Sequence, residues 1–206
     1  HSIIFKTLTI KKNTMKFKQH IFVALTICLT QALSAQKKWT QIDTNIIIGE
    51  FNASQVALSN DGSIVAVTNA SGGEDIAGLV RVYQNINGSW TQIGSDIEGE
   101  VYNDFFGRSV SLSSDGSIIA IGGPQHKTNL ANEGHVKIYQ NVSGTWTQIG
   151  SDIEGETYDN FCGQSVSLSG DGNTVAIGSP GHGIDDMWWS GHVRIYRNVS
   201  GTWTQI

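Results

Sequence analysis

The tetrapeptide Trp-Thr-Gln-Ile, on which the fold assignment depends, occurs at residues 39–42, 90–93, 146–149 and 203–206. Successive copies are separated by 51, 56 and 57 residues. Repeats of about 50 residues are typical of proteins in which one supersecondary unit is stacked several times. We therefore expect three similar units along most of the chain.

A longer stretch also repeats between the copies of the tetrapeptide. Residues 110–122 match residues 166–178 closely, and residues 56–67 are a weaker first copy. Each stretch holds an Asp-Gly dipeptide between two runs of alternating apolar and polar residues. Because Asp-Gly tolerates the positive φ of a tight turn, the pattern predicts paired strands joined by hairpins.

Each copy is predicted to be a four-stranded antiparallel meander. A second turn, at residues 141–144 in the second copy, joins the last two strands. The four strands expected in the second copy are residues 109–113, 117–122, 135–140 and 145–149. Such a sheet has apolar residues on both faces and cannot bury them alone, so it must stack on its neighbours.

Radial stacking of these units predicts an all-β fold of β-propeller blades, with a β-solenoid as the alternative. The blades are antiparallel repeats of about 50–57 residues, at about residues 50–104, 105–160 and 161–206. Known propellers have about four to eight blades. Three copies therefore predict an incomplete ring.

The start of the chain reads as a targeting segment. The first methionine is Met15, so residues 1–14 are predicted to be an upstream or non-native segment. Residues 15–35 have the basic start, apolar stretch and small residues of a signal peptide. The apolar stretch is too short to span a bilayer. We expect residues 36–206 to be a propeller fragment, secreted or at the cell surface, with no membrane span after cleavage.

Composition limits the partners that the chain can take. The first 35 residues hold five lysines and no acidic residue, which leaves 8 basic against 18 acidic residues in the rest. Nucleic acid is therefore not an expected partner, because no basic stripe is present. Beyond residue 35 the chain has one cysteine, Cys162, and no internal disulfide can form. No cofactor is predicted.

Short motifs at the strand ends resemble the FG-GAP repeat of integrin α-chain propellers. They are Phe106-Gly107 and Ile-Gly-Gly-Pro at 121–124, with Cys162-Gly163 and Ile-Gly-Ser-Pro at 177–180 in the third copy. The first copy is degenerate, and the resemblance covers about residues 50–206. It implies a propeller used for extracellular recognition or adhesion. WD-repeat and kelch propellers are weaker matches of the same fold class.

The calcium site of many FG-GAP blades is not carried over to this chain. The corresponding loops have shrunk to the Asp-Gly turns of Asp61, Asp115 and Asp171. Ca²⁺ takes about six to eight oxygen ligands, and a two-residue turn cannot supply them. These aspartates are interpreted as turn residues, and no metal site is predicted.

Ligand-binding residues are predicted on the rim that carries the strand-two-to-three loops and the crossings between blades, because binding residues concentrate on variable loops. The alternatives are that the acidic residues are only solvated and that the tryptophans cap the blade. The predicted residues are Asp96, Glu98, Glu100, Asp104, Asp152, Glu154, Glu156, Asp159, Asp185, Asp186, Trp188 and Trp189.

The histidines are interpreted mainly as structural residues. His135 and His192 occupy equivalent places in Gly-His-Val, which suggests ordinary strand positions. His182, with Asp185 and Asp186, has ligand chemistry but no recognised metal-site spacing.

Function is predicted to be binding and not catalysis, because no nucleophile elbow, phosphate loop or paired catalytic motif is present. We expect a recognition or adhesion module that binds an extracellular protein or glycan through the rim loops. The alternative is the propeller domain of a larger secreted enzyme whose catalytic part lies beyond Ile206.

Overall fold

The structure is a computed structural model. It describes residues 40–43, 45–46, 55–71, 77–127, 132–181 and 190–206. The chain divides into two compact units, residues 1–41 and 42–206, and all the strands belong to the second. The predicted upstream segment and signal peptide lie outside the described residues, so those two predictions are not tested.

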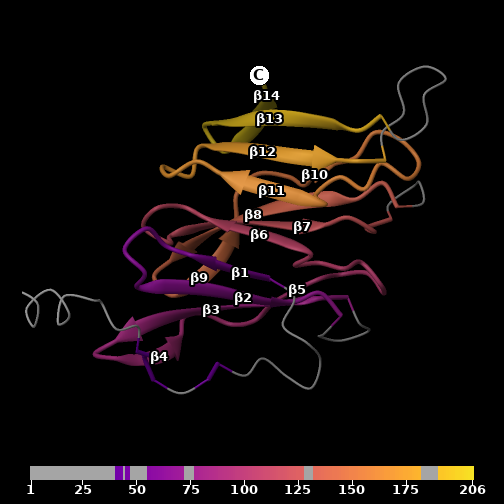
Figure 1. Ribbon diagram of the computed structural model, residues 1–206. Coiled ribbons are helices and arrows are strands. Elements are labelled where there is room, and N and C mark those ends of the chain that lie inside the picture. The colour runs from indigo at the N-terminus through magenta and orange to yellow at the C-terminus, as the bar shows by residue number, and fades with distance from the viewer. Residues whose placement is uncertain (1–39, 44, 47–54, 72–76, 128–131, 182–189) are drawn as a thin grey trace, which may run out of the picture. The chain divides into compact units, whose positions relative to one another are not determined.

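The second unit consists of three antiparallel sheets that follow one another along the chain (Figure 1). The first sheet holds β1 (Gln55–Leu58), β2 (Ile64–Asn69), β3 (Leu79–Ile86), β4 (Ser89–Gln92) and β5 (Ile97–Glu98). The second holds β6 (Ser109–Leu112), β7 (Ile118–Gly123), β8 (His135–Val142), β9 (Thr145–Gln148) and β10 (Ile153–Glu154). The third holds β11 (Ser165–Leu168), β12 (Thr174–Ser179), β13 (His192–Val199) and β14 (Thr202–Gln205).

The predicted all-β fold of four-stranded meanders is confirmed. No helix occurs among the residues that the structure describes, and each sheet pairs its four main strands in chain order. The short strands β5 and β10 were not predicted. β5 pairs with the first half of β3, and β10 pairs with the first half of β8. The second halves of β3 and β8 pair with β4 and β9, the strands that carry the repeated tryptophan. No helix in the described part of the chain is long and apolar enough to cross a membrane.

The repeated tetrapeptide forms the joint between successive sheets. Trp146 Nε1 donates a hydrogen bond of 3.0 Å to the carbonyl oxygen of Ile93 in the preceding sheet. Trp203 Nε1 donates in the same way to the carbonyl oxygen of Ile149, at 2.9 Å. Tryptophan and isoleucine of one tetrapeptide therefore face opposite neighbours, which explains why the whole motif recurs.

The first strands of the sheets approach one another closely because their facing residues are small. Ser109 Oγ donates to the carbonyl oxygen of Gly163 at 2.7 Å. Ser111 Oγ accepts a 3.0 Å hydrogen bond from the backbone N–H of Leu168. A Cβ atom on Gly122 would lie 2.1 Å from the same Gly163 carbonyl oxygen. Only glycine can stand at that position.

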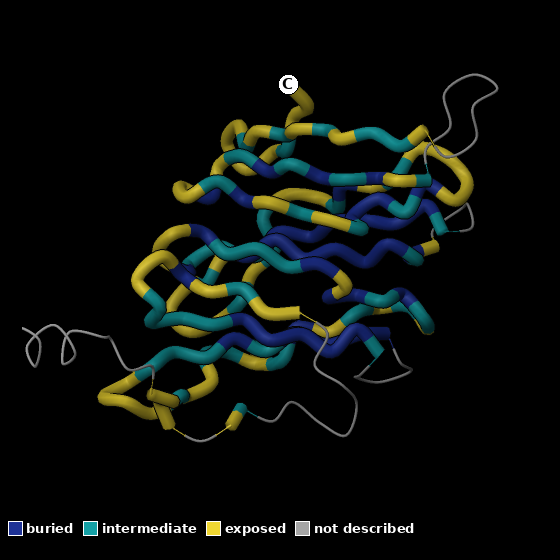
Figure 2. Tube along the Cα trace, viewed as in Figure 1, coloured by how far each residue is buried: buried dark blue, intermediate teal, exposed yellow. Residues whose placement is uncertain are grey.

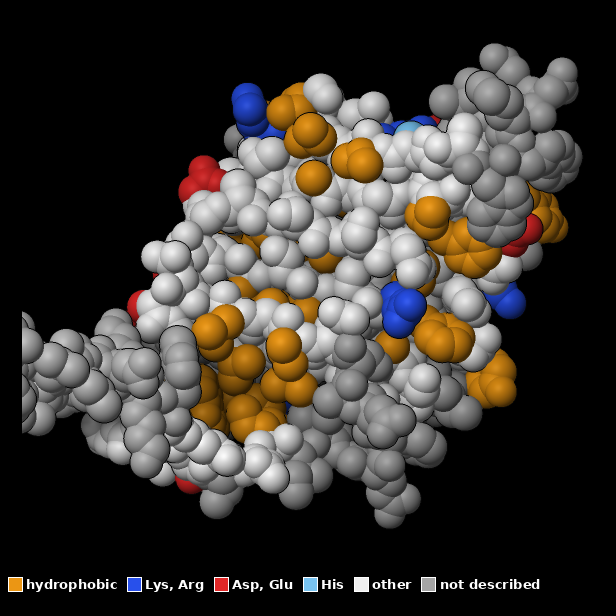
Figure 3. Space-filling model, in the orientation of Figure 1, with side chains coloured by type: hydrophobic (Ala, Val, Ile, Leu, Met, Phe, Trp, Pro, Cys, Tyr) orange, Lys and Arg blue, Asp and Glu red, His pale blue; other side chains and the backbone are white. Residues whose placement is uncertain are grey.

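Apolar side chains fill the spaces between sheets, and the last sheet has a face without a neighbour. Val136 and Ile138 of β8 are 0% and 1% exposed, whereas their equivalents Val193 and Ile195 of β13 are 68% and 42% exposed. Burial is accordingly greatest in the middle of the stack (Figure 2). Hydrophobic side chains also gather over the first sheet and along the joints (Figure 3). The ring of blades is not closed in the described residues.

The tight turns are held by their aspartates. Asp115 Oδ1 accepts hydrogen bonds from the Ser113 hydroxyl at 2.7 Å and from the Ser117 backbone N–H at 3.0 Å. The turns of Asp61 and Asp171 are built in the same way. These donors lower the pKa of all three carboxyl groups, that of Asp61 to about 2.

Replacement of Trp146 by phenylalanine tests the joint. The ring stays apolar but the hydrogen bond to Ile93 is lost, so we expect the melting temperature to fall by about 2–4 °C, the effect of roughly 1 kcal/mol in a domain of this size. Trp90→Phe is the matched control, because no hydrogen bond from the Trp90 indole is found among the described residues. Equal effects of the two substitutions would contradict the proposed joint.

Acid should weaken the fold through the turn carboxylates. Their pKa values are lower in the folded chain than the ordinary 3.8. The stabilisation is therefore complete above about pH 4 and is lost as the pH falls toward 2. Thermal unfolding between pH 2 and 5 should show a shallower decline in Asp115→Asn than in the wild type. A decline unchanged in this variant and in Asp61→Asn would rule out the turns as its cause.

Candidate functional site

The crossings between blades lie beside the loops that connect the second and third strands, as predicted. Gly99 and Phe106 of the first crossing donate backbone hydrogen bonds to the carbonyl oxygens of Gly78 and Ala77, just before β3. The Asp-Gly turns lie at the other ends of the strands. Residues from three blades therefore meet on one rim.

A cleft of about 460 Å³ opens where these loops meet, a volume within the range of small-ligand pockets. Arg108 is exposed there, and no carboxylate of the described residues lies within ion-pair distance of it. The lining therefore combines the Arg108 guanidinium with amide, hydroxyl and aromatic groups. The lining residues that carry this chemistry are Ser71, Phe105, Arg108, Gln125, Phe161 and Gln164.

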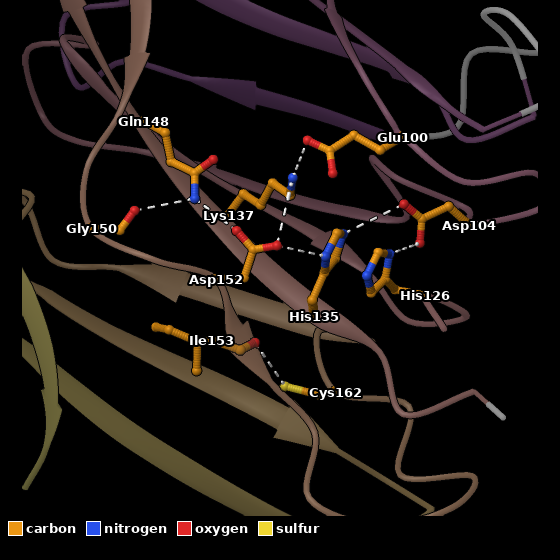
Figure 4. Close-up of polar contacts among 10 residues, drawn as sticks. All are labelled: Glu100, Asp104, His126, His135, Lys137, Gln148, Gly150, Asp152, Ile153 and Cys162. Carbon is orange, nitrogen blue, oxygen red and sulfur yellow. Dashed lines mark hydrogen bonds and ion pairs between the residues drawn. The ribbon is translucent and has the colours of Figure 1, made fainter. Parts of the chain in front are cut away.

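Behind this cleft lies a buried cluster of polar side chains, formed by Asp104, His126 and His135 (Figure 4). His126 Nδ1 lies 3.2 Å from Asp104 Oδ1, and His135 Nε2 lies 3.5 Å from Asp104 Oδ2. The two imidazole rings are stacked, with their centroids 3.9 Å apart and their planes 12° apart. Asp104 and His126 directly neighbour Phe105 and Gln125 of the cleft, so the same two segments build both sites.

The cluster continues on the other side of His135. His135 Nδ1 lies 3.3 Å from Asp152 Oδ2, and Lys137 Nζ lies 3.5 Å from the same oxygen. Lys137 also forms a 2.6 Å ion pair with Glu100. Gln148 donates to Asp152 Oδ1 at 2.7 Å. His135 is thus placed between two carboxylates.

Two groups of the cluster have displaced pKa values. Burial favours the neutral form of His126, but the hydrogen bond and charge of Asp104 outweigh it and raise the His126 pKa. Burial likewise opposes the charge of Asp152, yet His135, Gln148 and Lys137 lower the pKa of that carboxyl group to about 2. A carboxylate at position 152 is therefore held next to the imidazole at neutral pH.

Several buried polar atoms of the cluster lack a hydrogen bond. They are Asp104 Oδ2 and both ring nitrogens of His135, whose contacts with the two aspartates are longer than hydrogen bonds with good geometry. Buried polar groups are nearly always satisfied, so each exception needs an explanation. His135 and Asp104 are both 0% exposed.

Most of the predicted acidic residues in the crossings form ion pairs with strand residues. Arg81 binds Asp96 through two hydrogen bonds, of 2.9 and 2.7 Å. Lys137 and Arg194, the equivalents of Arg81, pair with the predicted Glu100 and Glu156 of the crossing before their own blade. The Lys137–Glu100 and Arg194–Glu156 contacts connect a blade to the crossing that precedes it, whereas Arg81 and Asp96 lie in one blade.

The remaining predicted residues are not brought together. Glu98 and Glu154 are exposed on β5 and β10, and exposed Asp159 accepts a hydrogen bond from Asn132. Asp104 and Asp152 join the buried cluster. The predicted Asp185, Asp186, Trp188 and Trp189 lie outside the described residues. Ligand binding by any of these residues stays a prediction.

Sequence reasoning did not select His126, although the chain holds a signal for it. Pro-x-His is followed by Gly-His-Val at residues 124–136, and again at 180–193 in the third copy. The position of Asp104 is taken by Asn160 there. The two histidines are brought together only by the β7–β8 connection, so the repeat alone does not reveal the cluster.

Comparisons with known proteins identify the fold. No family model and no curated protein matches the chain. Among solved structures, it is similar to a "putative 6-phosphogluconolactonase" of Bacteroides uniformis, with 13% identity and a TM-score of 0.53 over 77% of this chain and 40% of that one. The three sheets are propeller blades.

Two further structures support the same conclusion. A protein of the same name from Bacteroides fragilis has 16% identity and a TM-score of 0.50 over 74% of this chain and 37% of its own. A hypothetical selenium-binding protein of Sulfolobus tokodaii has 13% identity and a TM-score of 0.56 over 78% and 42%. The chain spans about two fifths of the length of these proteins.

These findings correct the assignment to the FG-GAP family. The resemblance is wrong because the structural neighbours are lactonase-like propellers and no FG-GAP family model matches. The motif residues serve the joint between blades: Gly107 has a φ of +88°, and Phe106 is fully buried. Both residues have a packing role in this chain, so by themselves they do not indicate adhesion.

The predictions of an adhesion module and of a protein without enzymatic activity are wrong for the same reason. Two of the structural neighbours are each named as a "putative 6-phosphogluconolactonase", and none of the three is named as an adhesion protein. A search for contiguous motifs is a poor test of catalysis in this fold, because a propeller site is built from loops of separate blades.

Gly123 makes room for the buried cluster, and its replacement tests the packing. A Cβ atom there would lie 2.7 Å from His135 Nε2 and 3.2 Å from Asp104 Oδ1. We expect Gly123→Ala to destabilise the fold by about 1–3 kcal/mol, as overpacking usually does. In a His135→Ala background the same change should cost much less. Chemical denaturation of the four proteins measures the difference, and equal costs in both backgrounds would contradict the interpretation.

Proposed function

We propose that this chain is part of a propeller enzyme that acts on a small carbohydrate-derived lactone, and that the substrate lies in the rim cleft around Arg108. The observation that carries the proposal is the Arg108 guanidinium, which has no carboxylate of the described residues within ion-pair distance, in a cleft of monosaccharide size. The names of the structural neighbours support a phosphorylated sugar lactone as the substrate class. Export of the chain through residues 15–35 remains part of the proposal.

Each kind of lining group suits one part of such a substrate. Arg108 presents several N–H donors in a planar fork, which fits the phosphate group of the substrate. Gln125 and Gln164 offer both donors and acceptors for sugar hydroxyl groups. Phe105 and Phe161 provide apolar surface for the ring carbons. Arg108 is the only cationic side chain among the described residues that line the cleft, so it is the expected contact for an anionic group.

Hydrolysis in this cleft would add water across the ester bond of the lactone. The hydroxyl of water joins the carbonyl carbon, the ring C–O bond breaks, and one proton is released as the product ionises to a carboxylate. His126 hydrogen-bonds Asp104 beside the cleft, but it is only 7% exposed and does not line the cleft, so we assign it no part in this step.

Calorimetric titration with 6-phosphogluconate, the hydrolysed product, tests the cleft. We expect Arg108→Gln to weaken binding about 10–100-fold, because charge-assisted hydrogen bonds are lost. Glutamine is the residue at the equivalent position 164, so the variant should fold. Gluconate, which lacks the phosphate, should bind wild type and variant equally.

Arg197→Gln is the matched control, since Arg197 is exposed on β13 and does not line the cleft. It removes the same charge and should leave binding unchanged. Equal losses in both variants would show that only overall charge matters and would refute the assignment of the site. Proton release from the lactone, followed by pH-stat, then tests for hydrolysis directly.

A further inference from the structure

We infer that Asp104, His126 and His135 form a binding site for a divalent transition-metal ion of the zinc type. One ligand-type atom from each of these buried residues lies within 4.8 Å of the others. Imidazole nitrogen and carboxylate oxygen are the ligands that zinc and its neighbours in the first transition row take in proteins. The inference concerns the buried cluster and does not depend on the substrate proposed for the cleft.

The spacing of the donor atoms fits such an ion. Zinc binds nitrogen and oxygen at about 2.0–2.2 Å, which places neighbouring ligands of a tetrahedral site roughly 3.3–3.6 Å apart. Asp104 Oδ1 and His126 Nδ1 are separated by 3.2 Å, and Asp104 Oδ2 and His135 Nε2 by 3.5 Å. The carboxylate thus stands at ligand distance from both imidazoles.

The unsatisfied atoms of the cluster are explained by this assignment. Asp104 Oδ2 and His135 Nε2 face each other without a hydrogen bond, in an environment from which water is excluded (Figure 4). A cation between them would satisfy both atoms, whose desolvation is otherwise uncompensated.

Asp152 lies where a residue that supports a metal ligand, without binding the ion itself, is usually found. Histidines that bind metals usually donate their second ring N–H to a carboxylate, which fixes the tautomer and orients the ring. His135 Nδ1 lies 3.3 Å from Asp152 Oδ2, while its Nε2 faces Asp104. Gln148 and Lys137 in turn hold Asp152. His135 is therefore already oriented for binding through Nε2.

Binding requires one movement. The two rings are stacked, and an ion bound to both must lie near both ring planes, so one ring has to turn. We expect His126 to turn, because it lies outside the strands and is 7% exposed, whereas His135 is 0% exposed and lies within β8. Three protein residues leave one position of a tetrahedral ion without a protein ligand, the ligand number found in catalytic zinc sites.

The third copy of the repeat has the same two histidine positions but a different residue at the position of Asp104. Asn160 stands at the place of Asp104, and His182 and His192 stand at the places of His126 and His135. An amide in place of the carboxylate removes the charged ligand while keeping the shape. Asn160 is itself buried, which shows that the blade accepts asparagine there. Asp104→Asn is thus the appropriate test substitution.

The test is a zinc titration of the whole chain after treatment with a chelator. We expect one zinc ion per chain by calorimetry and by elemental analysis after desalting. Zinc at about 100 times its dissociation constant should raise the melting temperature by about 5–10 °C. Calcium and magnesium, which require more oxygen ligands, should cause no shift.

Variants distinguish this site from adventitious binding. Asp104→Asn should weaken zinc binding by at least about 100-fold, and Asp152→Asn about 10–100-fold. Glu98→Gln removes one exposed acidic group elsewhere on the rim and should change nothing. Circular dichroism and melting without metal show whether each variant is folded.

If a variant fails to fold, an NMR measurement on the wild type still tests the proposal. Zinc should shift the imidazole nitrogen NMR signals of two histidines and separate the stacked rings. Absence of binding at 100 µM zinc, or equal affinity in Asp104→Asn and Glu98→Gln, would overturn the proposal. So would zinc-induced shifts confined to histidines other than His126 and His135.

Discussion

Each sheet of this protein can bury its apolar faces only against the next sheet, and the other features of the structure follow from that requirement. The joints need close approach, so serine and glycine face each other along the first strands. They also need a directional contact, which the tryptophan indoles provide by donating to the preceding isoleucine carbonyls. Where no sheet follows, as on β13, the same kinds of side chain remain exposed.

The same requirement determines where chemistry can occur. Connections that pass from one blade to the next bring charged residues into the space between sheets. There, Lys137 and Arg194 take carboxylate partners from the preceding crossing. In the middle blade the crossing also places Asp104 next to His126 and His135. The adjacent residue Phe105 lines the cleft. Cleft and buried cluster are therefore two sides of one junction.

The fold was largely predictable, because strand alternation and repeat spacing are local properties that a single sequence displays. The two-residue strands β5 and β10 were missed, since such short segments have no measurable period and depend on pairing with β3 and β8. The FG-GAP resemblance failed for a different reason. Phe106 and Gly107 are required by packing between blades, and packing requirements recur in propellers with unrelated functions.

The sequence by itself determined the β class, the order of the strands, the turn chemistry of Asp61, Asp115 and Asp171, and the position of the rim. Only the tertiary structure decided which rim residues meet. Asp104 and His126 are 22 residues apart and Glu100 and Lys137 are 37 apart, and nothing in their local patterns couples them. Their contacts arise from the stacking of one sheet on another. Polar residues that the sequence pattern would place in solvent are buried there, and some of their polar atoms lack a hydrogen bond.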